Sequence, residues 1–179
     1  MMYMFFADGF EEVEAIATLD VIRRAGIVIK SVGVNGKEIK GSHGITVICD
    51  ETTDSISVDN LSGIILPGGM PGTTNLMADK TVNDFIDYCN ENNLYICAIC
   101  AAPMILGRKG LLEGKEAICF PGFEDELSGA IISDKFVCKS GNIITAKGMG
   151  SAVKFGLEIV SAFKDENTTA ELAATLQIS

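Results

Sequence analysis

Short runs of apolar, often β-branched residues alternate along this chain with longer stretches whose apolar residues recur at helical spacing. This alternation is typical of strand–helix–strand units, in which a helix carries the chain back so that successive strands run parallel. The pattern predicts strands at 3–7, 27–34, 63–66, 95–99 and 142–146, and helices at 11–25, around 82–89, at 101–106 and at 151–163. No internal repeat or Pro/Gly/Ser-rich linker interrupts it. We therefore expect one domain over residues 1–179, of the α/β class, with a mostly parallel central sheet.

Two local patterns refine this prediction. Asn35-Gly36 is a strong hairpin signal and predicts that the strand at 27–34 turns back through 45–49. Alternating runs around 117–120 and 135–139 predict a small β excursion before the last strand.

Composition narrows the class of protein. Hydrophobic residues make up 47% and charged residues 21%, which is enough for a core and argues against disorder. The net charge of −10 argues against non-specific binding to nucleic acids or anionic membranes. No apolar run approaches the roughly 18 residues of a membrane span, and the first residues lack a basic leader. We expect a cytoplasmic protein that binds neither nucleic acid nor membrane.

The cysteines and the histidine do not suggest a metal site. The six cysteines, expected as free thiols in such a compartment, are Cys49, Cys89, Cys97, Cys100, Cys119 and Cys138. One close pair and one histidine do not make a zinc ligand set, and His43 is expected in a turn or on the surface. Gly148-Met149-Gly150 imitates a dinucleotide loop, but Val153 stands where the third glycine belongs. We expect neither a metal nor another cofactor.

Cys100 is the strongest candidate for a functional residue. It follows a predicted strand that ends at Ile99, and open α/β sheets bind ligands at the carboxyl ends of their strands. It also stands at a helix start, where free backbone N–H groups stabilise a thiolate. The small Ala101 and Ala102 permit the tight turn of a nucleophile elbow. The alternative is a buried structural cysteine.

Three further features are weaker. Cys97 and Cys100 match a dithiol motif, but residues three apart in a strand lie on opposite faces and roughly 10 Å apart, which predicts no disulfide. Gly68-Gly69 follows a strand and is either an ordinary turn or a source of backbone N–H groups for an oxyanion. Of Glu11, Glu12 and Glu14, at least two are expected as surface carboxylates, and one could point toward Cys100.

Together these pieces resemble the ThiJ/PfpI family, in particular its parkinsonism-associated deglycase branch. The matching stretches are collinear and span nearly the whole chain: Ala7-Asp8-Gly9-Phe10-Glu11-Glu12-Val13-Glu14, Asp20-Val21-Ile22-Arg23-Arg24-Ala25-Gly26, Leu66-Pro67-Gly68-Gly69, Ala98-Ile99-Cys100-Ala101-Ala102-Pro103 and Thr145-Ala146-Lys147-Gly148-Met149-Gly150. The resemblance implies a flavodoxin-like three-layer sandwich, usually a homodimer.

The resemblance also implies roles for individual residues. Cys100 would be the reactive nucleophile, and Glu14 a protonated partner that donates a hydrogen bond to the thiolate or its oxidised form. The N–H groups of Gly69 and Ala101 would form an anion-binding pocket. Family activities include glutathione-independent conversion of methylglyoxal to lactate, removal of early glycation adducts, and sensing of peroxide through cysteine oxidation.

The chain departs from the family pattern at three positions. Some members carry a histidine in the segment matching Cys119-Phe120-Pro121, and this chain has none there. Members with peptidase activity have a histidine directly after the cysteine, where this chain has Ala101, so a Cys-His-Asp/Glu triad is unsupported. Lys147 stands where the human-like branch has an arginine.

The sequence thus predicts a cysteine-dependent enzyme of the glyoxalase or deglycase type that acts on small reactive dicarbonyls or glycation adducts. The alternative is a non-enzymatic oxidative-stress sensor or redox-regulated chaperone, switched by oxidation of Cys100. The expected partners are a small carbonyl substrate and a second copy of the chain.

Overall fold

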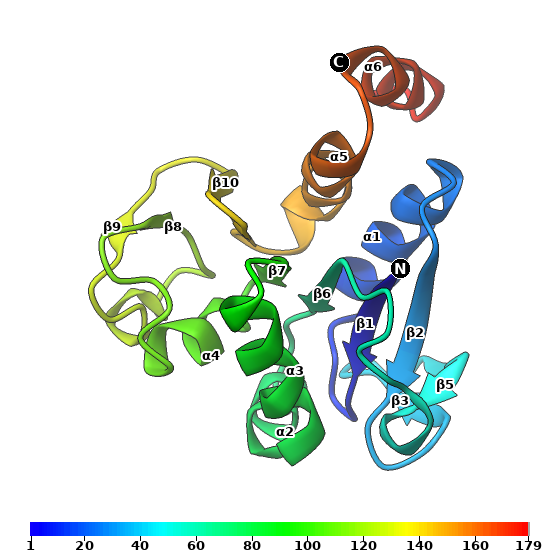
Figure 1. Ribbon diagram of the computed structural model, residues 1–179, viewed down its shortest axis with the longest axis vertical. Coiled ribbons are helices and arrows are strands. Elements are labelled where there is room, and N and C mark those ends of the chain that lie inside the picture. The colour runs from blue at the N-terminus through cyan, green and yellow to red at the C-terminus, as the bar shows by residue number, and fades with distance from the viewer. Residues whose placement is uncertain (179) are drawn as a thin grey trace.

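In the computed structural model, residues 1–178, the part of the chain that is described, form a seven-stranded sheet flanked by helices (Figure 1). Its strands, in the order β10-β11-β7-β6-β1-β2-β5, are β10 (Val137–Ser140), β11 (Ile143–Ala146), β7 (Tyr95–Ile99), β6 (Gly63–Leu66), β1 (Met2–Phe6), β2 (Ile29–Gly33) and β5 (Glu51–Thr52). Neighbouring strands are parallel except for the β10–β11 pair. This confirms the predicted three-layer α/β class.

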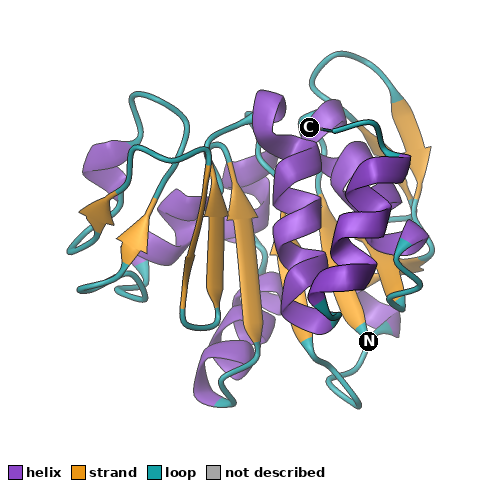
Figure 2. Ribbon diagram, turned by 90° about the horizontal axis from the view of Figure 1, so that it is seen from above, coloured by secondary structure: helices purple, strands orange, loops and turns teal. Residues whose placement is uncertain are grey.

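Helices cover both faces of the sheet (Figures 1 and 2). One layer holds α1 (Glu12–Arg24), α5 (Ala152–Phe163) and α6 (Glu166–Thr175), and the other holds α2 (Gly72–Ala78), α3 (Lys80–Glu91) and α4 (Pro103–Arg108). Side chains of β1 alternate between the layers: Phe5 packs on one side, and Met4 and Phe6 on the other. Every residue of β1 is buried, as expected of a central parallel strand.

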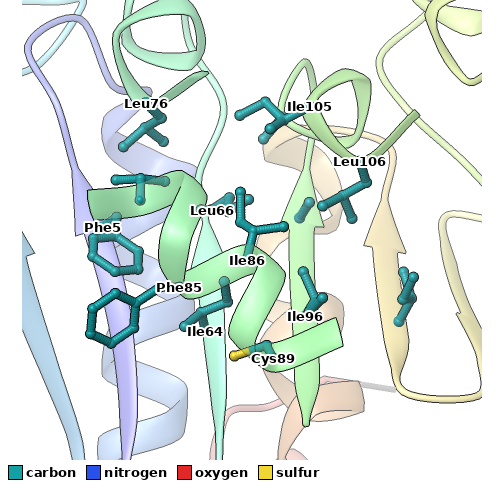
Figure 3. Close-up of a cluster of buried hydrophobic side chains, with 14 of the residues drawn as sticks. Phe5, Ile64, Leu66, Leu76, Phe85, Ile86, Cys89, Ile96, Ile105 and Leu106 are labelled. Atoms are coloured by element: carbon teal, nitrogen blue, oxygen red, sulfur yellow. The ribbon is translucent and has the colours of Figure 1, made fainter. Parts of the chain in front are cut away.

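The helices begin and end where their sequences indicate. The side chain of Glu11 accepts a hydrogen bond at the start of α1, and Arg23 and Arg24 occupy its last turn, which suits the helix dipole. Asp79 caps α3 in the same way through the N–H of Val82. The apolar face of α3, including the predicted core residue Cys89, packs on the sheet (Figure 3).

The predicted hairpin is corrected by the structure. Asn35 and Gly36 do form a turn with positive φ, but the returning segment β4 (Thr46–Ile48) pairs with β3 (Glu38–Lys40) and not with β2. Both edges of β2 are occupied by its parallel neighbours β1 and β5, so the chain must leave the sheet before it can form a hairpin.

The segment between α4 and β11 is also partly different from the prediction. A small β excursion exists as the pair β8 (Glu116–Ala117) and β9 (Ile131–Ile132). The run at 135–139, however, enters the main sheet as its antiparallel edge strand β10. The sequence pattern does not predict helices α2 and α6. Helix α2 is short, and α6 has no buried residue that would create an apolar period in the sequence. Within residues 1–178, no helix has the length and apolar character needed to cross a membrane.

Candidate active site

Cys100 lies on the turn that connects β7 to α4, at the carboxyl end of the sheet. Its φ of 64° is in the left-handed region, which residues other than glycine rarely adopt. The Cys100 N–H donates to the carbonyl of Ala146 on β11 at 2.9 Å, and its own carbonyl accepts from the Phe120 N–H at 2.8 Å. These two bonds fix the turn from both sides, in the manner of a nucleophile elbow.

Glu14 comes from the first turn of α1 and reaches the same place. Its side chain is buried, and its Oε2 accepts a hydrogen bond from the Gly68 N–H at 3.1 Å. A side-chain hydrogen bond also joins the Glu14 carboxyl to the Cys100 thiol. The residue that the family resemblance singles out among the three glutamates is therefore the one that contacts Cys100.

Gly68 lies against both of these side chains. A Cβ at this position would lie 2.5 Å from the Cys100 Cβ and 2.5 Å from Oε2 of Glu14, far inside contact distance. Sequence reasoning considered this glycine as part of a turn or an N–H source, and missed that its absent side chain makes room for the pair.

Gly69 and Ala101 supply backbone hydrogen bonds to Cys100, and both bonds lower the pKa of its thiol. Gly69 has a φ of 90°, which a glycine tolerates without strain. The structure thus brings together all four of the residues proposed for the site.

Cys100 and Glu14 form a coupled pair of acids. Burial raises the pKa of Glu14 to about 7. Burial, followed by the charge of the neighbouring Glu14, raises the pKa of Cys100 to about 12. The position of Cys100 at a helix start predicts a stabilised thiolate. This prediction is wrong when Glu14 is ionised, because burial and the Glu14 charge raise the pKa of Cys100 more than the two backbone bonds lower it. Since one proton comes off near neutral pH and the second only at high pH, the two groups share one proton over a wide range.

Contrary to what strand geometry predicts, Cys97 and Cys100 do not lie on opposite faces of the sheet. Cys97 is fully buried in β7, and all cysteines in the described residues are free thiols. However, Cys100 packs on the same side of the sheet as Cys97, and not on the opposite side. The reason is that Cys100 lies beyond the strand, where its positive φ turns the chain and ends the strand alternation.

The neighbouring Glu12 has a separate, structural role. Burial by itself raises the pKa of the Glu12 carboxyl. Hydrogen bonds from the His43 ring and from the N–H groups of His43 and Ile45 outweigh this effect and lower the pKa to about 2. His43 lies in the turn between β3 and β4, as expected, and its Nδ1 is 3.0 Å from Oε2 of Glu12. This contact joins the hairpin to α1.

Glu11, Glu12 and His43 also bring three possible ligand atoms within 4.8 Å of one another, a grouping that the sequence did not suggest because its members are 31 and 32 positions apart. The oxygens of Glu12 already accept from the hairpin N–H groups, and Oε2 of Glu11 accepts from the Glu14 N–H at 2.7 Å. These bonds account for the buried Glu12 carboxylate and the half-buried Glu11 carboxylate without an ion.

A pocket of about 270 Å³ opens beside the pair. It is lined mainly by Phe120, Pro121, Phe136, Lys147, Gly148 and Met149. Lys147 lies near the Phe136 ring, with 5.8 Å between Nζ and the ring centroid.

Comparison with known proteins identifies the family. The DJ-1/PfpI family matches residues 1–162. The chain belongs to this family. Protein dj-1beta of Drosophila melanogaster is 33% identical over 176 residues, which cover 97% of this chain and 94% of the fly protein. The glutathione-independent glyoxalase DJR-1.2 of Caenorhabditis elegans is 29% identical over 93% of this chain and 89% of its own length.

DJ-1 structures show the same fold over nearly all of the chain. The crystal structure of Drosophila melanogaster DJ-1beta superimposes with a TM-score of 0.94 at 31% identity, covering 99% of this chain and 97% of that one. A Toxoplasma gondii DJ-1 described as oxidized superimposes with a TM-score of 0.93 at 28% identity, covering 99% and 98%.

Proposed function

We propose that this DJ-1/PfpI protein is a cysteine-dependent enzyme that converts small 2-oxoaldehydes to 2-hydroxy acids without glutathione. The observation that carries the proposal is the buried Glu14 carboxyl, which is hydrogen-bonded to the thiol of a partly exposed cysteine on a strained turn. A nucleophile beside a group that titrates near neutral pH is what such a reaction needs. The name of the worm relative, a glutathione-independent glyoxalase, supports the same activity.

In the proposed reaction, the Cys100 sulfur forms a bond to the aldehyde carbon of the substrate. The electrons of the C=O double bond move to the oxygen, which takes up the proton that Cys100 and Glu14 share, so the product is a hemithioacetal and Glu14 is left as a carboxylate. The backbone N–H groups of Gly69 and Ala101 stabilise negative charge on sulfur before the attack and on oxygen during it.

Glu14 then moves one proton between adjacent carbons. It removes the proton on the former aldehyde carbon and returns one to the ketone carbon, so that the first carbon is oxidised and the second reduced by the same two electrons. Water hydrolyses the resulting thioester, which releases the 2-hydroxy acid and restores the thiol. Since no histidine stands beside the cysteine, Glu14 performs both transfers.

The same nucleophile would attack early glycation adducts at the carbon that derives from the aldehyde of the dicarbonyl. Cys100 also suits the second candidate function, which is peroxide sensing. The observation that favours sensing is that Cys100 alone among the cysteines of the described residues is partly exposed. Turnover separates the two functions, because a sensor does not consume substrate.

The test is lactate formation from methylglyoxal by the purified protein in the absence of glutathione. We expect turnover in the wild type and none in Cys100→Ser. Cys138→Ser is the matched control, because a serine hydroxyl can keep the bond that the Cys138 thiol donates to the Glu116 carbonyl at 3.2 Å. If the wild type forms no lactate, or Cys100→Ser forms it equally well, the proposal fails.

The proposed partner is a second copy of the chain. Exposed apolar side chains of α1 and of the hairpin, Val13, Ile16 and Ile45, surround a shallow depression of about 460 Å³. Ile48 on β4 is 80% exposed nearby in the hairpin. Such a patch is typical of an interface, and a homodimer is what the family resemblance implies.

A further inference from the structure

The pocket beside the Cys100–Glu14 pair is lined by large apolar side chains that the fold does not bury. Phe120 is 47% exposed, Phe136 is 61% exposed and Met149 is 60% exposed. Within residues 1–178, the lining contains no carboxylate side chain. Its cation, Lys147, stands over the Phe136 ring at a distance typical of a cation–π contact. Folding alone gives no reason for this apolar surface, so it indicates a ligand with apolar surface of its own.

The pocket borders the reacting groups without containing them. Gly148 forms the shared wall: the position of its absent Cβ is 3.2 Å from Cδ2 of Phe120 and 3.8 Å from Oε1 of Glu14. The next residue, Met149, donates a backbone hydrogen bond to the Glu14 carboxyl and also lines the pocket. On the other side, the Phe120 N–H is bonded to the Cys100 carbonyl. A molecule bound covalently at Cys100 therefore has this pocket as its nearest apolar neighbour.

From this arrangement we infer that the enzyme prefers 2-oxoaldehydes whose ketone carries an aryl or bulky alkyl group, and that Phe120 is a specificity-determining residue. The inference rests on the proposed function, and names the substrate class for the same site. The aldehyde carbon is at Cys100 and Glu14 serves the adjacent carbon, so the substituent on the ketone is the part of the substrate that extends into the pocket.

The size of the pocket fits such a substituent. An apolar cavity of about 150 Å³ is enough to bind benzene in an engineered protein, and this pocket measures about 270 Å³. It is below the usual range of about 300–1,000 Å³ for drug-sized ligands. A single aromatic ring or a branched alkyl chain therefore fits, whereas a methyl group leaves most of the apolar wall in contact with water.

Phe120 is the residue through which the preference is best tested. Its backbone is fixed by the bond to Cys100, while its ring contacts the Gly148 wall, so a change of side chain alters the pocket and not the turn. One additional methylene group in a pocket changes specificity by roughly 10- to 200-fold, and a phenyl group adds more surface than that.

The experiment compares kcat/KM for phenylglyoxal and methylglyoxal in the wild type, Phe120→Ala and Phe120→Leu. Because intrinsic reactivities differ, the measured quantity is the change in this ratio between variants. We expect Phe120→Ala to lower the phenylglyoxal preference by about tenfold, and Phe120→Leu to retain most of it. The control Val28→Ala removes an exposed apolar side chain just before β2, a strand separated from β7 and β11 by β1 and β6. It should leave the ratio unchanged. An equal ratio in the wild type and Phe120→Ala overturns the inference.

A second measurement keeps the inference testable if neither substrate is turned over, an outcome that would refute only the proposed function. Phenacyl bromide and bromoacetone carry the same two substituents and alkylate a thiol without catalysis. Their rates at Cys100, followed by peptide mass spectrometry, are divided by their rates with glutathione. A phenacyl preference that decreases in Phe120→Ala supports the pocket, and no preference over glutathione overturns it.

Discussion

The Cβ that Gly68 lacks would lie 2.5 Å from the Cβ of Cys100, so this glycine holds open the space in which the thiol meets Glu14. Gly68→Ala must therefore displace either Cys100 or Glu14. We expect the variant to lose at least about tenfold in the rate of Cys100 alkylation by iodoacetamide, and about 1–3 kcal/mol in the free energy of unfolding from overpacking.

The control for this substitution is Gly150→Ala, which adds the same methyl group where no other atom lies within 4 Å. Its free energy of unfolding, measured by urea denaturation, should stay within about 0.5 kcal/mol of the wild type. If Gly68→Ala is as stable and as reactive as the wild type, the short distances from position 68 to Cys100 and Glu14 do not require a glycine.

Glu12 should stabilise the fold only above a certain pH. Its pKa is about 2 in the folded protein and 4.5 as a model value, so its stabilising contribution is present above pH 4.5 and is lost as the pH falls from 4.5 toward 2. The difference corresponds to about 3 kcal/mol. We expect Glu12→Gln to lower the free energy of unfolding by about 2–3 kcal/mol at pH 7 and by progressively less below pH 4.5.

Urea denaturation at several pH values between 7 and 3 measures this dependence. Glu38→Gln, an exposed carboxylate in the same hairpin, is the matched control and should change stability little at any pH. A loss that is equally large at pH 7 and pH 3 would contradict the role of the Glu12 charge.

Mild peroxide should oxidise Cys100 before any other cysteine and stop at the sulfenate or sulfinate. Among the described residues, the other cysteines are buried, whereas Cys100 is partly exposed and within reach of peroxide. Oxidation follows access and thiolate character. Peptide mass spectrometry after graded peroxide, with each cysteine quantified, provides the measurement. A Cys97–Cys100 disulfide as the main product, or earlier oxidation of another cysteine, would contradict this prediction.

The dimer proposal predicts that a charge in the patch on α1 and the hairpin separates the copies. Ile16→Glu and Ile45→Glu should each shift the protein toward the monomer in sedimentation velocity. Val28→Glu places the same charge at a side chain that is 65% exposed outside the patch, and should leave the assembly unchanged. A monomeric wild type would contradict the dimer proposal. A dimer that persists in both patch variants would show that the interface lies outside this patch.

Much of the fold could be predicted from the sequence because the central strands are buried and apolar, and because the main helices that cover them are long. The strands β1, β6, β7 and β11 and the helices α1, α3 and α5 lie close to their predicted positions. The hairpin was misplaced because strand pairing is decided by which sheet edges are free, and Asn35-Gly36 carries only local information. Helix α6 was missed because none of its residues is fully buried, so its sequence carries only a weak apolar pattern.

The candidate site was only partly accessible from the sequence. Cys100 could be found from its place between a strand and a helix, whereas Glu14 stood out from its neighbours only through the family resemblance. The space at Gly68 depends on three segments that meet in the fold. The raised pKa of Cys100 depends on burial and on the Glu14 charge, neither of which a helix-start pattern contains.

The central claim concerns the first of the two ionisations of the pair, near pH 7. It states that the proton which then remains is on Glu14 and the negative charge on Cys100, whereas the pKa of about 12 belongs to a Cys100 thiol whose neighbour Glu14 is already ionised. The rate of Cys100 alkylation by iodoacetamide, measured from pH 5 to pH 11 in the wild type, Glu14→Gln and the matched control Glu11→Gln, tests it most directly. The account predicts a wild-type rate that rises with an apparent pKa near 7, where the pair loses its first proton, and the same profile in Glu11→Gln. In Glu14→Gln the thiol is still alkylated, although lactate formation is lost. A wild-type rate that rises only above about pH 9 would place the proton on Cys100 and the charge on Glu14, and would contradict the account.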